Sequence, residues 1–537
     1  MNMVFKPVTR LVFSLVFIIC LAIVLPAGAF ASTYVPVGDD AYNMLFRLEA
    51  EGLITSGLLD TLPISRKEMQ RLISEAERNA VASNHLNNED REDISLLKAR
   101  FGDEAQGAAK YIKPLDEAYA RYVYASANPR ENGLNYAGAA NPNGFVYNNG
   151  GDDYGKNSNF RLGFASLADM GWFSFYINPE LRYTGATSQF NQGKAYGVGA
   201  TSQVNLNKVY GVFSAVGLDL EVGRDSQWWG PGYNGAILLS NNQDPFTMIK
   251  LTNDRPAVLP WIFRYLGLTK FTAFVTKLGS DATPPRPYLW GLRVEFKPSP
   301  YFEFGASRLA QLGGEGRPAG LQMWLDSFTG SGENGQNGSA DDPGKQEAGF
   351  DGKVTFPFSV QPVQMYFEAD GTDECGGFPC RWAKLVGVYL PRILSYDRVD
   401  FRAEYADNHV SGRPVPNVWY DRGEYNFVYS TDKDLIIGDH MGTDSDDLFL
   451  QADYFIPKLG GRVYLSYDRE RHNLSGLAVP GVTGIFEPVQ NALTLGAYFY
   501  TMKDYSLNGQ FTNGWITGTP QGRLDFNLFT LGITRYF

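Results

Sequence analysis

The sequence predicts an all-β transmembrane barrel of about 18 antiparallel strands, preceded by a small N-terminal α-helical domain. From residue 119 onward, apolar and polar residues alternate with period 2 in segments of about ten residues separated by turns, the pattern of outer-membrane barrels. Beyond residue 31, no apolar run approaches the length of about 20 residues that a membrane helix requires. A membrane-resident chain of this kind has to form a closed barrel, because lipid cannot satisfy free backbone groups.

The composition limits the classes of function. The 537 residues include 58 Gly, 36 Phe, 31 Tyr and 9 Trp but only 4 His and 3 Cys, and the formal net charge is −11. A nucleic-acid partner requires a basic surface, so we expect none. The sequence contains no phosphate-binding loop, dinucleotide fingerprint or nucleophile elbow, so we expect neither a cofactor nor catalytic residues.

Residues 1–31 have the features of a secretory signal peptide. Lys6 and Arg10 precede the apolar run 11–25, and Ala29-Phe30-Ala31 supplies an A-x-A cleavage site. Cleavage there removes two positive charges and changes the net charge from −11 to 45 − 58 = −13. The sequence therefore predicts an exported protein of the cell outer membrane.

Residues 32–117 are expected to form a periplasmic helical domain. Ser65 and Glu68 have the spacing of a capping box, and an apolar stripe follows at the spacing of one helix face. The stripe comprises Met69, Leu72, Ile73 and Ala76. We expect one further helix on either side of this one. Short amphipathic helices bury little apolar surface by themselves, so we expect all three to dock on a larger structure.

Residues 118–537 are expected to form the barrel. Within 398–405, one face carries Val399, Phe401, Ala403 and Tyr405, and the other carries Arg398, Asp400, Arg402 and Glu404. Four consecutive charged positions suit a water-filled or hydrogen-bonded lumen and not lipid. We expect residues 206–223 to form one strand whose even-numbered residues are on the apolar face.

The lengths of the turns predict a barrel with two unlike ends. Short turns such as 169–171 and 298–300 alternate with long Gly-, Asn- and Asp-rich stretches such as 128–157 and 310–348, as in outer-membrane barrels. We expect strands near residues 119, 158, 171, 207, 269, 288, 301, 349, 362, 382, 398, 415, 424, 446, 461, 491, 505 and 524.

The C-terminus predicts two further partners. Phe537 ends the chain, and apolar residues alternate back through Ile533, Leu531 and Phe529, which resembles the signal that the barrel-assembly machinery recognises. Arg535 departs from the apolar or aromatic residue usual at its place. We expect outer-membrane lipid around the barrel.

Two cysteines remain after the signal peptide. Cys375 and Cys380 are predicted to close a small disulfide loop, as two cysteines of an exported protein commonly do. The alternative, a metal or redox pair, requires C-x-x-C spacing and further ligands.

The histidines and acidic clusters give weak signals of chemistry. His409-Val410-Ser411 resembles the H-x-S of outer-membrane phospholipases, but it lies in a predicted loop, where nucleophile and base lack a rigid mutual geometry. Asp444, Asp446 and Asp447 lack the spacing of a calcium-binding EF-hand. We therefore expect no metal site.

The most distinctive motif covers residues 223–242. Trp228 and Trp229 offer apolar platforms for the C–H faces of a sugar, and nearby polar side chains offer donors and acceptors for its hydroxyls. The alternative is that Gly-Pro-Gly at 230–232 forces turns and the indoles pack in the lumen. With two loop cations, the candidate polysaccharide-binding residues are Arg224, Asp225, Trp228, Trp229, Tyr233, Asn241, Asn242, Arg413 and Arg422.

At this motif the sequence resembles the Wzi family of capsule-assembly proteins. The matching stretches are Gly-Arg-Asp-Ser at 223–226, Trp-Trp-Gly-Pro-Gly at 228–232, Leu-Leu-Ser-Asn-Asn at 238–242, Pro245-Phe246, Asn417-Val418-Trp419-Tyr420 and Ile437-Gly438-Asp439-His440-Met441-Gly442-Thr443-Asp444. The resemblance covers essentially the whole mature chain. It implies an 18-stranded outer-membrane barrel with a periplasmic helical bundle, and a lectin that holds capsular or related polysaccharide on the cell surface.

The leading hypothesis is therefore a non-enzymatic protein that binds capsular polysaccharide or another exopolysaccharide through many weak contacts. A net charge of −13 repels an acidic capsule, so Arg413 and Arg422 are expected to offset it if the glycan is acidic. The alternatives are a passive diffusion channel and, last, an outer-membrane hydrolase.

Overall fold

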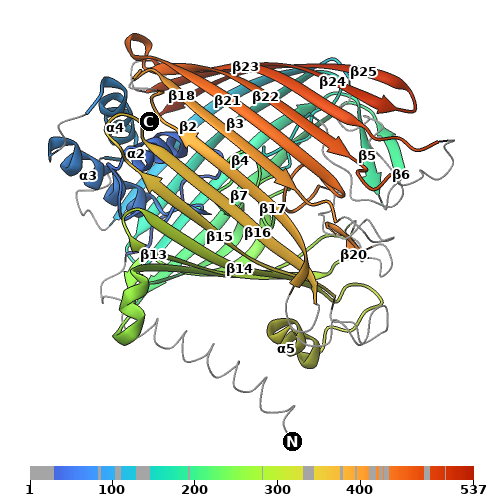
Figure 1. Cartoon of the computed structure of the whole chain (residues 1–537), viewed down its shortest axis with the longest axis horizontal. Coiled ribbons are helices and arrows are strands. Elements are labelled where there is room, and N and C mark those ends of the chain that lie inside the picture. Colours follow the sequence, from blue (N-terminus) through green and yellow to red (C-terminus); the bar gives the residue numbers. More distant parts are fainter. Residues whose placement is uncertain are drawn as a thin grey trace, which may run out of the picture.

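A computed structural model gives the architecture of the chain (Figure 1). The structure describes residues 30–82, 86–102, 110–127, 145–191, 194–280, 282, 284–330, 344–374, 379–393, 396–410, 419–422, 427–428, 435–476, 484–501 and 504–537. All but the last two residues of the predicted signal peptide lie outside these ranges.

The main body is a closed antiparallel β-barrel, as predicted. Within the described ranges it has eighteen strands of eight or more residues: β2 (Lys110–Ala125), β3 (Asn157–Met170), β4 (Phe173–Thr184), β7 (Thr201–Ala215), β8 (Leu218–Asp225), β10 (Phe246–Asn253), β12 (Leu268–Lys277), β13 (Tyr288–Ser299), β14 (Phe302–Leu312), β15 (Lys345–Phe356), β16 (Val363–Glu374), β17 (Pro379–Leu390), β18 (Val399–Asp407), β21 (Ser445–Ile456), β22 (Gly461–His472), β23 (Val489–Thr501), β24 (Tyr505–Thr519) and β25 (Gly522–Tyr536). The barrel closes where β2 pairs with β25. The two-residue β11 (Ala257–Val258) also pairs with β12.

The strand predicted near residue 207 is in fact a hairpin. Val216 and Gly217, with φ of 48° and 77°, form a tight turn between β7 and β8, the backbone geometry that suits a two-residue hairpin. Across a two-residue turn, the inward-facing residues change from the even-numbered positions to the odd-numbered positions. Tyr210 is therefore buried before the turn, whereas Val222 is 53% exposed after it, which corrects the predicted single apolar face.

Two other predicted strands are not in the barrel wall. β18 pairs directly with β21, with Tyr405 opposite Leu448, which leaves no place for strands near 415 and 424. The described residues between them include β19 (Asp421–Arg422) and β20 (Phe427–Val428), which pair only with each other. The barrel wall contains β8 and β10 instead. The predicted number of strands is therefore right, although two of the predicted strands are not in the wall.

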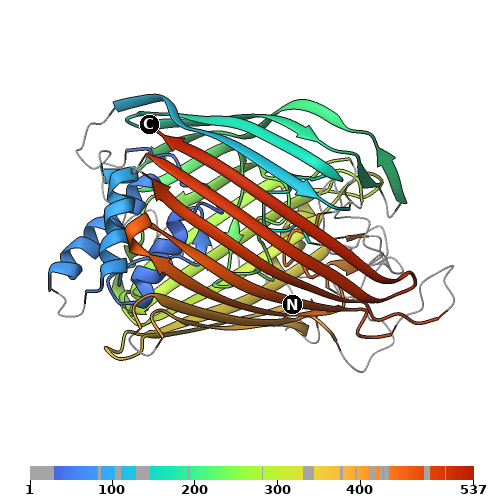
Figure 2. The same cartoon turned by 90° about the horizontal axis from the view of Figure 1, so that it is seen from above.

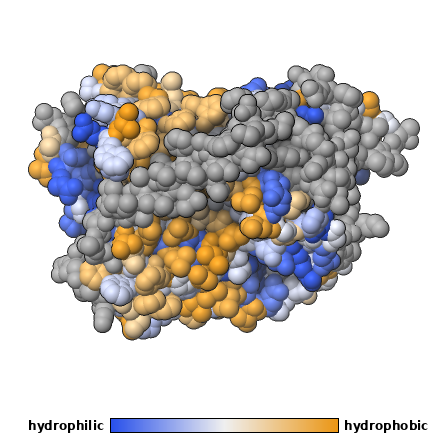
Figure 3. All heavy atoms as spheres, turned by 90° about the horizontal axis from the view of Figure 1, so that it is seen from below, coloured by the Kyte–Doolittle hydropathy of each residue, from blue (hydrophilic) through white to orange (hydrophobic). Residues whose placement is uncertain are grey.

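The alternation of side chains places charge inside the barrel and apolar surface outside. In β18, Asp400 and Glu404 are buried at 2% and 4% exposure, whereas Tyr405 is 40% exposed. Figure 3 shows apolar side chains spread over the flank of the barrel between its two ends. This pattern agrees with the predicted polar lumen and lipid-facing exterior.

Three N-terminal helices lie at one end of the barrel (Figures 1 and 2). They are α2 (Ala41–Ala50), α3 (Arg66–Ala82) and α4 (Asn88–Phe101). The Ser65 Oγ accepts a hydrogen bond of 3.1 Å from the Glu68 amide, which is one half of the capping box predicted for α3. The Glu68 carboxylate instead accepts hydrogen bonds from Arg71. None of the helices in the described ranges is long and apolar enough to cross a membrane.

The helices contact the end of the barrel at which the short turns lie. Arg392, in the turn after β17, pairs with Glu51 after α2 at 2.7 Å, and α4 contacts the short 3-10 helix η3 (Pro457–Leu459) between β21 and β22. The opposite end carries longer connections, including α5 (Leu321–Thr329) and the hairpin of β5 (Thr187–Asn191) and β6 (Lys194–Val198) (Figure 1).

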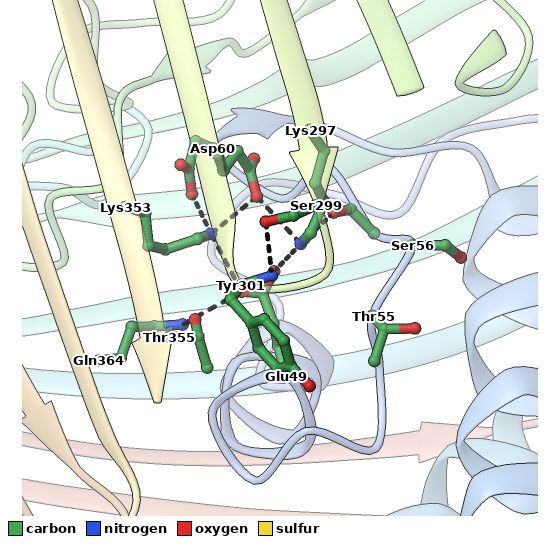
Figure 4. Close-up of polar contacts among 12 residues, drawn as sticks. Glu49, Thr55, Ser56, Asp60, Lys297, Ser299, Tyr301, Lys353, Thr355 and Gln364 are labelled. Atoms are coloured by element: carbon green, nitrogen blue, oxygen red, sulfur yellow. Dashed lines mark hydrogen bonds and ion pairs between the residues drawn. The ribbon is translucent and has the colours of Figure 1, made fainter. Parts of the chain in front are cut away.

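A buried ionic cluster joins the N-terminal region to the barrel wall (Figure 4). This docking cluster consists of Glu49, Asp60, Lys297, Glu303 and Lys353, all at most 5% exposed. Glu49 accepts from Lys297 at 2.7 Å and from Lys353 at 3.0 Å, and Lys353 also pairs with Asp60. Burial by itself raises the pKa of Glu49, but the two lysines outweigh it and lower this pKa to about 2. Glu49 is therefore a fixed anion of the interface.

The packing of α4 is expected to depend on pH through Asp93. Burial raises the pKa of the Asp93 carboxyl to about 8 from 3.8, although Arg47 lies 3.8 Å away. A carboxyl with a higher pKa in the folded protein binds its proton more tightly when folded. The stabilisation of the folded protein by the protonated Asp93 carboxyl is therefore complete below pH 3.8 and is lost as the pH rises through 8.

We expect Asp93→Asn to remove this contribution. The melting temperature of the wild-type protein in detergent should fall more steeply than that of the variant between pH 4 and 8, the interval that the two pKa values define. Arg91→Gln on the same helix is the control. Parallel pH profiles for the wild type and Asp93→Asn would contradict the assignment.

Candidate functional site

The residues of the distinctive motif cross the interior of the barrel. The segment 226–245, here called the lumen segment, connects β8 to β10, yet its backbone amides bind carboxylates on other strands. Glu368 on β16 accepts from Gly232 at 3.0 Å and from Ile237 at 2.9 Å. Glu404 on β18 accepts from the amides of Tyr233 and Asn234 at 2.6 and 2.7 Å. The segment therefore occupies the lumen between these strands, which argues against a wide open channel.

Both tryptophans of the motif are buried. Trp228 and Trp229 are 8% and 1% exposed and form β9, which pairs with β1 (Thr61–Leu62) of the N-terminal region. The Trp229 ring meets Phe274 edge-on at 5.3 Å between centroids. An indole buried to this degree has no face free for a sugar, so its environment favours the packing alternative. The sequence had left both alternatives open.

The remaining candidates of the motif divide into packing residues and cavity residues. Asp225 is 1% exposed and pairs with Lys208 at 2.8 Å, and the Asn242 amide donates to the carbonyl of Ile436 at 3.1 Å. The Arg224 Nε donates to the carbonyl of Asn207 at 3.3 Å. Tyr233 and Asn241 differ from these, because they line a cavity.

This lumen cavity has a volume of about 570 Å³. Its walls combine phenol rings with side-chain amides and hydroxyls, the groups that contact the C–H faces and hydroxyls of sugars. The principal members are Tyr119, Tyr147, Tyr154, Tyr176, Asn178, Asn207, Tyr233, Asn234, Asn241, Tyr464, Thr494, Tyr498, Tyr500, Asn508, Gln510 and Thr512. Among the residues that the structure describes, this is where polar and aromatic candidates converge.

Most of the charged side chains that line the lumen cavity form ion pairs, either with each other or with residues outside its lining. Arg182 lies 3.5 Å from Asp152 and also binds Glu180. Burial opposes ionisation of Asp152, but Arg182 and Arg161 outweigh it and lower the pKa of this loop carboxyl. The paired cations and anions leave neutral polar groups as the surface for a ligand.

Tyr233 is held in a defined orientation at the wall of the lumen cavity. The Arg402 guanidinium lies 4.2 Å from the centroid of its ring, and Gln451 donates to its hydroxyl at 3.3 Å. Burial raises the pKa of Tyr233, so the phenol stays protonated at neutral pH. The hydroxyl can therefore both donate and accept a hydrogen bond.

Several predicted residues lie outside the described residues. Arg413, Ser411 and Cys375 are among them, and the structure describes only the backbone of Arg422 in β19 and Cys380 in β17. Of the predicted H-x-S arrangement, the structure describes His409, whose Nδ1 lies 2.8 Å from the Asp444 carboxylate. The disulfide and the two loop cations remain predictions.

The cavity residues on the barrel strands were not among the residues predicted from the sequence. In β4, burial alternates along the strand, so Asn178, Glu180 and Arg182 all face inward. The same period that predicted the strand marks these positions as polar and inward. It could not show which inward positions face a cavity and which face packed protein.

Comparisons with known proteins identify similar chains. A family model described as capsule assembly protein Wzi matches residues 127–520. An uncharacterized 55.8 kDa protein in the cps region of Klebsiella pneumoniae is 26% identical over 392 residues, which are 72% of this chain and 68% of that protein.

Two solved structures illustrate the range of similarity to this chain. One of them is Wzi of Escherichia coli, which is described as a carbohydrate-binding β-barrel of the outer membrane involved in group 1 capsule assembly. The TM-score is 0.68 at 20% identity, and the match covers 94% of this chain and 100% of that chain. OprD of Pseudomonas aeruginosa gives a TM-score of 0.43 at 10% identity, covering 79% of this chain and 97% of that one.

Proposed function

Because the chain belongs to the capsule assembly protein Wzi family, whose model matches residues 127–520, we propose that it binds capsular or related exopolysaccharide. The protein then attaches this polysaccharide to the cell surface. In this proposal it is a lectin of the outer membrane and has no catalytic role. Export by the N-terminal signal and insertion through the C-terminal Phe537 signal belong to the same proposal.

The observation that carries the proposal is the lumen cavity. A repeating polysaccharide presents many hydroxyls and C–H faces, and the cavity combines tyrosine rings with asparagine and glutamine side chains. Neutral polar groups of this kind bind uncharged hydroxyls without the desolvation of a fixed charge. The site is therefore better suited to the neutral, hydroxyl-rich parts of a glycan than to its acidic groups.

Deleting the gene tests the attachment function. We expect the deletion strain to release polysaccharide into the medium while its total synthesis is unchanged, and a plasmid copy should restore surface polysaccharide. Unchanged retention on the mutant cells would overturn the proposed function.

Replacing Tyr233 by alanine tests the lumen cavity as the binding site. The change removes one aromatic face, and we expect the purified protein to bind the polysaccharide about twofold to twelvefold more weakly, since aromatic contacts contribute about 0.5–1.5 kcal/mol. Tyr233→Phe should retain most of the affinity because the ring stays in place.

Tyr301→Ala is the matched control for this measurement. Tyr301 is 54% exposed in the turn between β13 and β14 and does not line the lumen cavity. Binding can be measured by isothermal titration calorimetry with purified polysaccharide fragments. Equal affinities for the Tyr233→Ala and Tyr301→Ala proteins would place the binding site elsewhere.

A further inference from the structure

A buried histidine faces a group of carboxylates inside the barrel. His440 lies in the described loop 435–444, which precedes β21, and it is 1% exposed. Asp447 on β21 and Asp468 and Glu470 on β22 point to the same place, and they are 4%, 5% and 0% exposed. Asp447 and Glu470 are directly opposite each other in the register of the two strands.

The four side chains have the spacing of ligands around one ion. The His440 Nε2 lies 3.8 Å from carboxylate oxygens of both Asp447 and Asp468, and 3.5 Å from Glu470. A tetrahedral ion with bonds of about 2.1 Å to nitrogen and oxygen separates its ligand atoms by about 3.4 Å. Ligand atoms of His440, Asp447 and Asp468 also lie within 4.8 Å of one another.

The carboxylate oxygens nearest to His440 accept hydrogen bonds from Asn234, Tyr147 and Gln490, but other polar atoms of the same side chains have no partner. Among the described residues, neither ring nitrogen of His440 has a hydrogen-bond partner, and the same holds for Oδ1 of Asp447 and Oδ1 of Asp468. The Oε2 of Glu470 lies 3.3 Å from the Nε2 of His472. Buried polar groups are normally hydrogen-bonded, and leaving a carboxylate oxygen without a partner costs several kcal/mol. No lysine or arginine of the described ranges forms an ion pair with the three carboxylates.

A second group of carboxylates inside the barrel differs from the group around His440. Asp60, Glu295 and Glu303 also lie close together, but cations are already present there. Lys353 contacts Asp60 and Glu303, and Arg293 lies 3.2 Å from Glu295. Asp60, Glu295 and Glu303 each also keep one carboxylate oxygen without a hydrogen-bond partner. The difference is therefore one of charge, because no lysine or arginine of the described ranges neutralises the carboxylates around His440.

Neighbouring side chains fix the orientation of the candidate ligands. Tyr147 stacks on the His440 ring at 3.7 Å between centroids with an interplanar angle of 14°, and its hydroxyl donates to Asp468. Asn234 of the lumen segment donates to Asp447 at 3.0 Å and to Asp468 at 3.2 Å. An Asp439 oxygen lies 3.5 Å from the other ring nitrogen of His440. Such outer contacts are typical of metal-binding histidines and carboxylates.

We propose that His440, Asp447 and Asp468, together with Glu470, bind one divalent transition-metal ion of the Zn²⁺ class. A carboxylate-only site would suit Ca²⁺ or Mg²⁺, but an imidazole ligand favours Zn²⁺ and similar ions. The ion would link the loop 435–444 to β21 and β22. Because Ile436 and Ile437 of this loop pack in the same core as Trp229, the ion would also fix the packing around the lumen segment.

Metal content and affinity test the proposal. The full-length protein, purified in detergent and incubated with ZnCl₂ before removal of the free ion, should retain one Zn²⁺ per chain by mass spectrometry of the metal. Co²⁺ in the same site should give visible d–d absorption. Millimolar Ca²⁺ or Mg²⁺ should not displace either ion.

Variants distinguish this site from adventitious binding. His440→Ala and Asp468→Asn should each lose the bound ion, whereas His409→Ala should keep it, because His409 pairs with Asp444 outside the cluster. Tyr147→Phe retains the stacked ring but loses the hydrogen bond to Asp468, and we expect its Zn²⁺ affinity to fall about 10- to 100-fold.

Two results would overturn the proposal. One is a folded wild-type protein, judged by its heat-modifiable migration in gels, that retains no Zn²⁺ or Co²⁺ after loading. The other is undiminished Zn²⁺ retention in folded His440→Ala and Asp468→Asn proteins. If His440→Ala does not fold, Asp468→Asn and Tyr147→Phe still decide the question, because both preserve side-chain volume.

Discussion

Replacing Lys353 by methionine is expected to detach the N-terminal region from the barrel. Lys353 is 4% exposed and contacts three carboxylates of the docking cluster, namely Glu49, Asp60 and Glu303. Removing one partner of a buried ionic group leaves uncompensated buried charge, which costs about 3–5 kcal/mol. The population of undocked molecules should therefore rise at least about a hundredfold.

Limited proteolysis measures this change, because cleavage of a transiently opened segment follows the population of the open form. We expect chymotrypsin to cut within the N-terminal helices of Lys353→Met far faster than in the wild type, with the barrel left intact. Lys98→Met is the matched control, since Lys98 is exposed and its pair with Glu77 contributes at most about 1 kcal/mol. Similar cleavage rates for the two variants would show that the docking cluster does not hold the helices.

Truncating Trp229 to alanine is expected to destabilise the interior of the barrel by about 3–5 kcal/mol. The indole of Trp229 packs against Phe274. The backbone amide of Trp229 donates to the carbonyl of Leu239 at 2.8 Å, and Trp229 pairs with Thr61 in the two-stranded sheet of β1 and β9. Removing the ring leaves a cavity at the point where the lumen segment, the N-terminal region and the wall meet. The loss should appear as a lower melting temperature in detergent, followed by tryptophan fluorescence.

The same variant decides between the two roles considered for the tryptophans. Trp229→Phe keeps an aromatic ring in the core and should retain both stability and polysaccharide binding if packing is the role. Trp172→Ala removes an indole that is 63% exposed and should change the melting temperature little. A stable Trp229→Ala protein that has lost only its affinity for polysaccharide would restore direct contact as the role of this residue.

The fold was predictable where local chemistry decides the structure. The Ser65 cap and the alternation of charge in β18 both depend on neighbours in sequence, and both are present in the structure. The hairpin at Val216 and Gly217 was missed because a two-residue turn interrupts the strand without interrupting the period of 2. A strand was predicted near residue 415, but the nearby Trp419 is 1% exposed and belongs to the packed interior.

The candidate site was less predictable because it depends on contacts between distant residues. The motif around Trp228 is distinctive in the sequence, yet its tryptophans are packed and its Tyr233 lines the cavity. His440 and Asp468 are 28 positions apart (468 − 440), without any spacing that signals a shared ligand. Only the register of β21 and β22 brings Asp447, Asp468 and Glu470 together.

The seam of the barrel has a consequence for assembly of the protein in the membrane. β2 is the first strand of the wall and β25 the last, and they pair with Ala120 opposite Ile533. Until the last strand is in place, β2 and β24 both carry a row of backbone groups without partners, and such edges are not tolerated in hydrocarbon. A chain that ends before β25 is therefore expected to remain outside the bilayer as an aggregation-prone open sheet, so the final 15-residue strand decides whether the other seventeen can enter the membrane.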